Sequence, residues 1–263
     1  MILVIDIGNT NIKLGVYDAN KLIASWRLSV SAPRTSDEIG IYIKNLFEEI
    51  GLSRDDFEGV IMSSVQPSLN YTFERACEYY VGKKPMIVGP GTKTGLNIKY
   101  SNPQEVGADR IVNSVAAYKL YGGPCIVIDF GTATTFNAIS ASGEFLGGCI
   151  APGIKTSLNS LTDSTAKLPT VELVKPNSVI GKTTIGNMQS GIIYGFIGLV
   201  KNIVASIKKE MKAPDAKVIA TGGLSELITS NDDDNTIDKV DRVLTLNGLK
   251  LIYNMNNQNQ AKE

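Results

Sequence analysis

The stretch Val4-Ile5-Asp6-Ile7-Gly8-Asn9-Thr10-Asn11 is nearly repeated at Val127-Ile128-Asp129-Phe130-Gly131-Thr132-Ala133-Thr134. Each copy is an apolar run that ends in an aspartate, followed by a glycine and by short hydroxyl or amide side chains. Apolar runs without alternation are typical of strands buried on both faces. Aspartate is poorly suited to the interior of a strand and is costly to bury unpaired, so its repetition indicates a role in binding a metal or a phosphate.

After each turn the alternation of a strand resumes, over Ile12 to Tyr17 in the first copy and Phe136 to Ile139 in the second. Each copy therefore predicts a β-hairpin with a polar tip. Glycine in the tip lets the chain turn sharply and lets a ligand approach the main-chain N–H groups. Two such tips facing each other would bind a polyphosphate from both sides.

The composition limits the partners and the mechanisms that the chain can have. The 263 residues carry 26 basic and 26 acidic side chains, so no positive electrostatic field that would attract nucleic acid or an anionic membrane is indicated. The chain has no histidine, which excludes every Ser-His, Cys-His and His-metal mechanism. The N-terminus enters a strand directly and no apolar run approaches the ~20 residues of a membrane span, so neither a secretory signal nor a membrane segment is expected. The three cysteines fit small buried residues in a reducing compartment.

The order of predicted elements repeats. The first half reads β-β-β-α-β-α-β, and the second half begins the same order after Gly122-Gly123-Pro124, a strong helix stop. The sequence therefore predicts an α/β fold of two duplicated lobes, at 1–121 with a connecting helix and at 122–263. The two lobes would face each other across a cleft lined by the repeated hairpins.

Several stretches outside the hairpins have their own predictions. Helical spacing predicts a long helix over Gly186 to Met211 and a final helix over Leu244 to Asn254. The strand Lys217 to Gly223 takes the place that Val60 to Val65 holds in the first half. Gly89 to Pro103 is expected to be irregular, and the run Asp232-Asp233-Asp234 to be a solvated loop.

Two other stretches are similar to the P-loop, a known phosphate-binding motif, but each lacks a feature that the motif needs. Gly181-Lys182-Thr183 has the end of a P-loop, but Pro176 stands where that motif needs glycine. In Gly148 to Thr156, Ile154 separates the second glycine from the lysine, and a P-loop needs the two adjacent. The paired hairpins are therefore the best candidate for a nucleotide site. The alternative is that they are polar turns of a duplicated fold and nothing more.

Within the hairpins, several side chains are candidates. Asp6 and Asp129 suit Mg²⁺ or another hard cation, because carboxylate oxygens are its preferred ligands. Lys13 would place a charge on phosphates or be solvated, and Thr132 would donate to a phosphate oxygen or satisfy its own turn. The pair Gly222-Gly223 would let a flat base lie on bare backbone or let a helix pack closely.

A second constellation is Gly107-Ala108-Asp109-Arg110, at the start of the connecting helix. Aspartate in a first helical turn often serves as a cap and complements the helix dipole. The functional alternative is a general base beside an arginine that fixes an anionic substrate. A carboxylate base for the hydroxyl group and an arginine for the carboxylate group are the least that a kinase acting on a small hydroxy acid needs.

At these motifs the chain resembles the type III pantothenate kinases, members of the actin/hexokinase/Hsp70 superfamily with ribonuclease-H-like lobes. The similar motifs run from Met1 to about Asn254: Asp6-Ile7-Gly8-Asn9-Thr10-Asn11, Gly107-Ala108-Asp109-Arg110, Asp129-Phe130-Gly131-Thr132-Ala133, Gly148 to Gly153, and Gly181 to Gly191. The resemblance implies ATP-dependent phosphorylation of the terminal hydroxyl of pantothenate, the first step toward coenzyme A. It also implies a cytoplasmic homodimer whose substrate site lies near the subunit interface.

The resemblance also implies residue roles. Asp109 would be the catalytic base, and pantothenate would be held by Tyr100, Gly107, Ala108, Asp109, Arg110 and Thr184. ATP would contact Asp6, Ile7, Gly8, Asn9, Thr10, Asn11, Ile12, Lys13 and Thr132. Asp129 would bind the monovalent cation, potassium or ammonium, that the family requires. Mg²⁺ would accompany the nucleotide, with Asp6 as a possible ligand.

Two other functions fit the same sequence. One is a kinase of the same superfamily acting on a sugar or another small alcohol. The other is a non-catalytic relative that regulates transcription. The joint presence of Asp6, Asp109, Arg110 and Asp129 argues against the regulator, because the fold would survive their loss and the chemistry would not.

Overall fold

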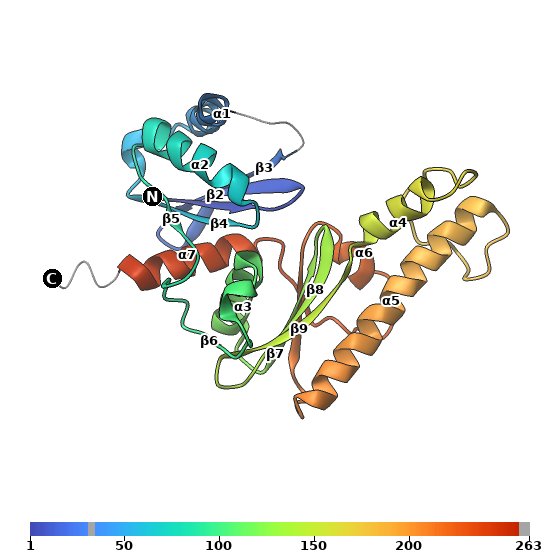
Figure 1. Cartoon of the computed structure of the whole chain (residues 1–263). Helices are drawn as coiled ribbons and strands as arrows, with labels where there is room; N and C mark the ends of the chain where they lie inside the picture. The colour runs from blue at the N-terminus through green and yellow to red at the C-terminus, as the bar shows by residue number, and fades with distance from the viewer. Residues whose placement is uncertain (31–34, 258–263) are drawn as a thin grey trace. The chain divides into compact units, whose positions relative to one another are not determined.

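The computed structural model describes residues 1–30 and 35–257, and its contacts separate the chain into two compact units. Unit 1 comprises Met1–Gly95, Ser101–Ala116 and the C-terminal stretch from Val243. Unit 2 comprises Leu96–Tyr100 and Ala117–Arg242. Each unit has its own β-sheet with helices packed on it (Figure 1).

The sheet of unit 1 has five strands in the order β3-β2-β1-β4-β5. Strand β1 pairs antiparallel with β2 and parallel with β4. The bounds are β1 Ile2–Ile7, β2 Asn11–Asp18, β3 Lys21–Ser29, β4 Gly59–Ser64 and β5 Met86–Ile87. All six residues of β1 are buried, as expected for a central strand covered on both faces.

Helices cover both faces of this sheet (Figure 1). Leu3, Ile5 and Ile7 of β1 pack in one core with side chains of the helices α1 and α2. The opposite face of β1, which carries Val4 and Asp6, packs against α7. The helical bounds in unit 1 are α1 Ser36–Glu49, η1 Arg54–Asp56, α2 Pro67–Ala76, the π-helical turn η2 Cys77–Val81, η3 Pro103–Glu105 and α7 Leu244–Asn257.

Helix α1 begins directly after a side-chain cap. Thr35 is the N-cap and forms a capping box with Glu38, in which each side chain accepts from the other residue's backbone N–H. Helix α3, Ala108–Tyr121, starts in unit 1 and ends in unit 2.

The sheet of unit 2 has six strands in the order β11-β10-β7-β8-β9-β6. Strand β7 pairs antiparallel with β8 and parallel with β10. The bounds are β6 Asn97–Ile98, β7 Cys125–Phe130, β8 Ala133–Ile139, β9 Glu144–Pro152, β10 Lys217–Thr221 and β11 Lys239–Val240. The helices are α4 Ile154–Asp163, α5 Thr184–Glu210 and α6 Ser225–Thr229.

Helix α5 is the main helix of the unit 2 core. Nine of its side chains are buried, including Ile193, Phe196 and Val200, and they pack on β7 and β8. In length and composition α5 is long and apolar enough to cross a membrane, with a mean hydropathy of 1.5, contrary to the sequence expectation that no run would be. Of that apolar window 44% is buried inside the protein, so core packing accounts for part of the apolar character of α5.

The pairing patterns confirm the predicted α/β fold with an internal duplication. In both sheets a central strand lies between an antiparallel hairpin partner and a parallel strand, so β1, β2 and β4 correspond to β7, β8 and β10. The predicted correspondence of Lys217 to Gly223 with Val60 to Val65 follows from the same pattern.

The compact units differ from the division at residues 121 and 122 in three places. The boundary lies within α3, between Ala116 and Ala117. Helix α7 belongs with unit 1, because it packs on β1, β2 and β4. Residues 96–100 belong with unit 2, because β6 pairs with β9. Neither β6, in a stretch expected to be irregular, nor β11 was predicted. Each has two residues and lacks the apolar run that marks β5, which is equally short.

The loop after α6 is more ordered than the expected solvated loop. Asp232 is buried, and its carboxylate accepts from the backbone N–H groups of Asp234 and Thr236, at 3.2 and 2.8 Å. Lys201 Nζ lies 3.1 Å from the same carboxylate. Burial raises the pKa of Asp232, but the hydrogen bonds from Thr236, Lys201 and Asp234 outweigh it and hold the pKa below its ordinary value.

We expect Asp232→Asn to lower the free energy of unfolding by about 1–3 kcal/mol at pH 6, the usual cost of leaving buried partners unsatisfied. A depressed carboxylate pKa stabilises the fold above the unfolded value of 3.8, and this contribution is lost as pH falls through the folded pKa. The difference from wild type should therefore shrink between pH 6 and pH 3 in urea denaturation. Asp233→Asn, an exposed neighbour in the same loop, is the control. An unchanged difference at pH 3 would contradict the assignment.

Candidate functional site

The turn after β1 is tight and leaves its tip exposed. Gly8 N–H donates to the carbonyl of Asn11 at 3.0 Å, and a side chain at Gly8 would meet that same carbonyl oxygen at 2.9 Å. Asn9 and Thr10 at the tip are exposed. Gln66 Nε2 donates to the Asn9 carbonyl at 3.2 Å, which ties the tip to the segment that follows β4. The tip therefore presents short polar side chains and backbone on a fixed turn.

Asp6, at the end of β1, is buried at 5% exposure and is held by its two neighbouring strands. Its carboxylate accepts from Ser63 Oγ of β4 at 2.8 Å and lies 3.4 Å from Lys13 Nζ of β2. The three residues face one another because Asp6 is in register with Lys13 on one side and with Ser63 on the other. Lys13 also donates to Thr245 of α7 at 3.3 Å. Lys13 is thus mostly buried against Asp6 and α7, and not simply solvated.

The start of α3 lies close to the ends of β4 and β1 in unit 1. A Cβ at Gly107 would lie 3.8 Å from a methyl group of Val65, and Val65 N–H donates to the carbonyl of Ile7 at 3.0 Å. The Gly107 to Arg110 motif therefore begins beside the strand end that carries the Gly8 turn. The sequence could not predict this proximity, because the two motifs lie far apart in the chain.

Asp109 lies in the first turn of α3, and its Oδ1 accepts from the backbone N–H of Arg110 at 2.8 Å. The same oxygen lies 2.6 Å from the position of a Cβ at Gly107, so a side chain at Gly107 would displace the Asp109 carboxylate. Arg110 is buried at 6% exposure, and its N–H also donates to the carbonyl of Gly107 at 3.1 Å. Asp109 thus has the helix contact that a cap would have, and it is also partly accessible.

The second turn, after β7 in unit 2, is held by the start of α4. Gly131 N–H donates to the carbonyl of Ala133 at 3.1 Å. The carbonyl of Thr132 accepts from Gly153 N–H at 3.1 Å and from Thr156 Oγ1 at 2.7 Å. A side chain at Gly153 would lie 2.4 Å from that carbonyl oxygen, so the approach requires glycine. Thr132 itself is exposed at the tip of the turn.

Asp129 lies between oxygen-bearing neighbours at the end of β7. It is in register with Thr221 of β10 and Thr135 of β8. Within the part of the chain that the structure describes, the buried Thr221 hydroxyl has no hydrogen-bond partner. A carboxylate beside such a hydroxyl is a donor set of hard oxygens that fits a cation. The sequence analysis did not identify Thr221 or its counterpart Ser63 as site residues. Their signal is a hydroxyl side chain at the end of a buried strand: Thr221 is the last residue of β10, and Ser63 is the last but one of β4.

The remaining predicted site residues lie in unit 2. The ring of Tyr100 packs on Phe145 with ring centres 6.3 Å apart. Thr184 is the first residue of α5 and lines a hollow of about 430 Å³. The other lining residues are Leu161, Leu168, Asn187, Met188, Gly191 and Ile192. This hollow is shallow and open to solvent, so Thr184 lies at the surface of unit 2.

The sequence profile of the type III pantothenate kinases matches residues 2–206. The chain belongs to this family. Membership establishes a kinase, a phosphotransferase that uses ATP with a divalent metal. In this type III pantothenate kinase family member, the two hairpins with their acidic strand ends and the Gly107 to Arg110 motif all lie within the matched residues.

Solved structures confirm the actin-like fold of this family member. A conserved putative Baf family transcriptional activator from Campylobacter jejuni is 21% identical, with 97% of this chain and 99% of that chain covered and a TM-score of 0.61. MreB 5 of Spiroplasma citri bound to AMPPNP is 12% identical, with 99% and 98% covered and a TM-score of 0.53. A putative N-acetylmannosamine kinase from Listeria monocytogenes is 14% identical, with 97% and 99% covered and a TM-score of 0.51.

The residues present fit the metals that such a kinase uses. In the described residues no three His, Cys, Asp or Glu side chains gather as a metal cluster. Mg²⁺ in kinases is bound by one or two carboxylates together with substrate phosphates and water, so a dedicated cluster is not needed. Asp6 has an ammonium and a hydroxyl beside it, which suits a carboxylate near phosphates. Asp129 and Thr221 suit a cation bound by oxygens.

Proposed function

We propose that this protein phosphorylates pantothenate on its terminal hydroxyl, with ATP as the phosphoryl donor. The hydroxyl oxygen forms a bond to the γ-phosphorus, the bond from that phosphorus to the ADP oxygen breaks, and the hydroxyl proton passes to Asp109. The transition state of phosphoryl transfer is loose, and the protein takes little part in the covalent chemistry. It accelerates the reaction mainly by positioning the reactants and by stabilising the charge of the transition state.

The observation that carries this proposal is the placement of Asp109 within unit 1. Asp109 follows Gly107, which lies against Val65, and Val65 is hydrogen-bonded to the strand that leads into the Gly8 turn. The position of Asp109, in the first turn of a helix that starts beside a glycine-containing polar turn, supports a role as general base toward a hydroxyl bound at that turn. The partial accessibility of Asp109 supports this role over that of a cap alone.

The other roles follow residue by residue from the family motifs. Asp6 to Lys13 and Thr132 contact ATP, with the Lys13 ammonium available to phosphate oxygens. Arg110 binds the pantothenate carboxylate, and its side chain is buried at the start of α3. Tyr100 and Thr184 complete the contacts to pantothenate. The product enters the route to coenzyme A, and the active form is a cytoplasmic homodimer.

The cation proposal rests on Asp129. When bound there, potassium or ammonium supplies positive charge near the phosphates. Asp129 and Thr221 would hold it, and Mg²⁺ would lie with the phosphates near Asp6. The Asp129 carboxylate lies close to Gly222, where a Cβ would be 2.6 Å from Asp129 Oδ1, so a side chain at Gly222 would displace it.

We expect ADP release by the purified protein to require both pantothenate and a monovalent cation, potassium or ammonium. The measurement is a coupled assay with pantothenate, N-acetylmannosamine or no acceptor, each with potassium or with sodium as the only monovalent cation. Turnover with the sugar but not with pantothenate would assign the protein to the sugar kinases. No turnover with either acceptor would favour the regulatory function, and equal turnover in sodium would refute the role given to Asp129.

A further inference from the structure

A short segment before α3 lies at the edge of the unit 2 sheet. Residues 96–100 pair with β9 through the two-residue strand β6, which is the edge strand. Asn97 N–H donates to the carbonyl of Gly143 at 3.1 Å, and Lys99 N–H donates to the carbonyl of Phe145 at 2.9 Å. Short edge strands open more readily than central ones. The segment ends in Tyr100, whose position therefore depends on further contacts.

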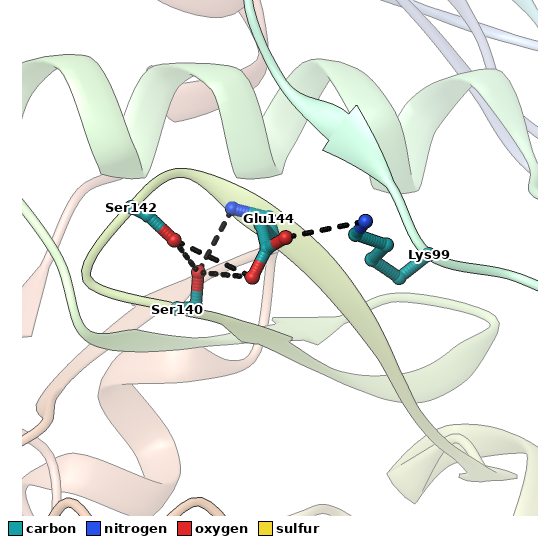
Figure 2. A network of polar contacts seen from close by, with 4 residues as sticks. All are labelled: Lys99, Ser140, Ser142 and Glu144. Carbon is teal, nitrogen blue, oxygen red and sulfur yellow. Dashed lines mark hydrogen bonds and ion pairs between the residues drawn. The ribbon is translucent and has the colours of Figure 1, made fainter.

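An ion pair supplies such a contact. Lys99 Nζ lies 3.4 Å from Glu144 Oε1 at the start of β9 (Figure 2). The next residues along the chain, Tyr100 and Phe145, are the pair whose rings are in contact. The Tyr100 ring also lies 3.7 Å from the position of a Cβ at Gly147, whose φ of +119° favours glycine. Lys99 and Tyr100 thus both lie against β9.

The carboxylate of Glu144 is itself fixed by the turn that precedes it. Glu144 Oε2 accepts from Ser140 Oγ and Ser142 Oγ, each at 3.4 Å, and Glu144 N–H donates to Ser140 Oγ at 3.0 Å (Figure 2). The turn packs on α3, because a Cβ at Gly143 would lie 2.8 Å from the ring of Tyr118. One carboxylate oxygen is thus held by serines, and the other is presented to Lys99.

We propose that Glu144, through its ion pair with Lys99, is a positioning residue that holds Tyr100 for pantothenate. This inference rests on the proposed function, in which Tyr100 contacts that substrate. The side chains of Lys99 and Glu144 are 52% and 32% exposed, so the pair adds little to the stability of the whole chain. Its effect falls on the local order of residues 96–100, and hence on pantothenate binding and not on ATP binding.

The test is a double-mutant cycle with Glu144→Gln, Lys99→Gln and the double variant. Each single variant should raise the KM for pantothenate by about two- to fivefold, the factor that corresponds to a partly exposed ion pair. The KM for ATP and kcat should not change. The double variant should have the same KM for pantothenate as either single variant, because each single substitution already removes the ion pair. Pantothenate binding measured by calorimetry should weaken by the same factor.

Lys44→Gln is the matched control, because Lys44 forms an exposed ion pair with Glu48 at 3.6 Å on α1 of unit 1. It should leave both KM values unchanged. Effects of Glu144→Gln and Lys99→Gln that add, or that change the KM for ATP as much as that for pantothenate, would overturn the proposal. A lower melting temperature with an unchanged pantothenate KM would also overturn it, in favour of a purely structural pair. Failure of the proposed function is distinguishable, since the wild type would then show no pantothenate-dependent turnover at all.

Discussion

Asp109→Asn should lower kcat by at least about 100-fold, the usual contribution of a positioned general base. The asparagine side chain has nearly the same shape but cannot accept the hydroxyl proton. Its oxygen can still accept from the Arg110 N–H, as Asp109 Oδ1 does at 2.8 Å, so the start of α3 is preserved. The measurement is kcat and the KM for pantothenate in the coupled assay, together with the melting temperature.

Glu105→Gln is the control for Asp109→Asn. Glu105 lies just before α3, in η3, and is exposed and hydrogen-bonded to Asn102 at 3.0 Å. Its substitution should leave kcat within about twofold of wild type, because the Glu105 side chain is exposed and bonded to its own turn. If Asp109→Asn kept wild-type kcat and altered only the melting temperature, Asp109 would be a helix cap, and the mechanism would fail.

Gly222→Ala should lower the free energy of unfolding by about 2–4 kcal/mol, since it combines an unfavourable backbone conformation with a steric clash. Gly222 has φ of +94°, and a Cβ there would lie 2.6 Å from Asp129 Oδ1 and from the backbone N and O of Phe130. Relief of this overlap must displace the end of β7. We therefore also expect the potassium concentration for half-maximal activity to rise, because the Asp129 carboxylate moves.

Gly195→Ala provides a control of opposite sign. Gly195 is an exposed position in α5 with open space where its Cβ would lie, so alanine should stabilise the helix by about 0.5–1 kcal/mol. Thermal unfolding of both variants gives the comparison. A Gly222→Ala protein as stable as wild type, with the same potassium dependence, would show that Asp129 is not held by this close approach.

The sequence predicted the elements that have a strong local pattern. Strand β1 is an unbroken apolar run, and α5 has apolar residues at helical spacing over many turns. The repeated acid–glycine stretch predicted both hairpins and, with the elements around them, the duplication that the two strand orders confirm. These features could be predicted because each depends on residues close together in the chain.

Long-range contacts could not be predicted in this way. Asp6 is 57 residues from Ser63, its hydrogen-bond donor, and Lys13 is 232 residues from Thr245. The burial of Asp232 in a run of three aspartates also depends on a residue distant in the chain, Lys201 of α5. A run of acidic residues is usually solvated, and only its partners reveal which member is buried.

The sequence by itself determined the kinase family, the two acidic hairpins and the Gly107 to Arg110 motif, because these are contiguous patterns of residue type. The tertiary structure alone decided that the Gly107 to Arg110 motif begins beside Val65 at the end of β4, that α7 packs on the first sheet, and that Lys99 contacts Glu144. The physical reason is that strand register and helix packing are set by shape and burial summed over the whole unit. No single stretch of sequence contains that information.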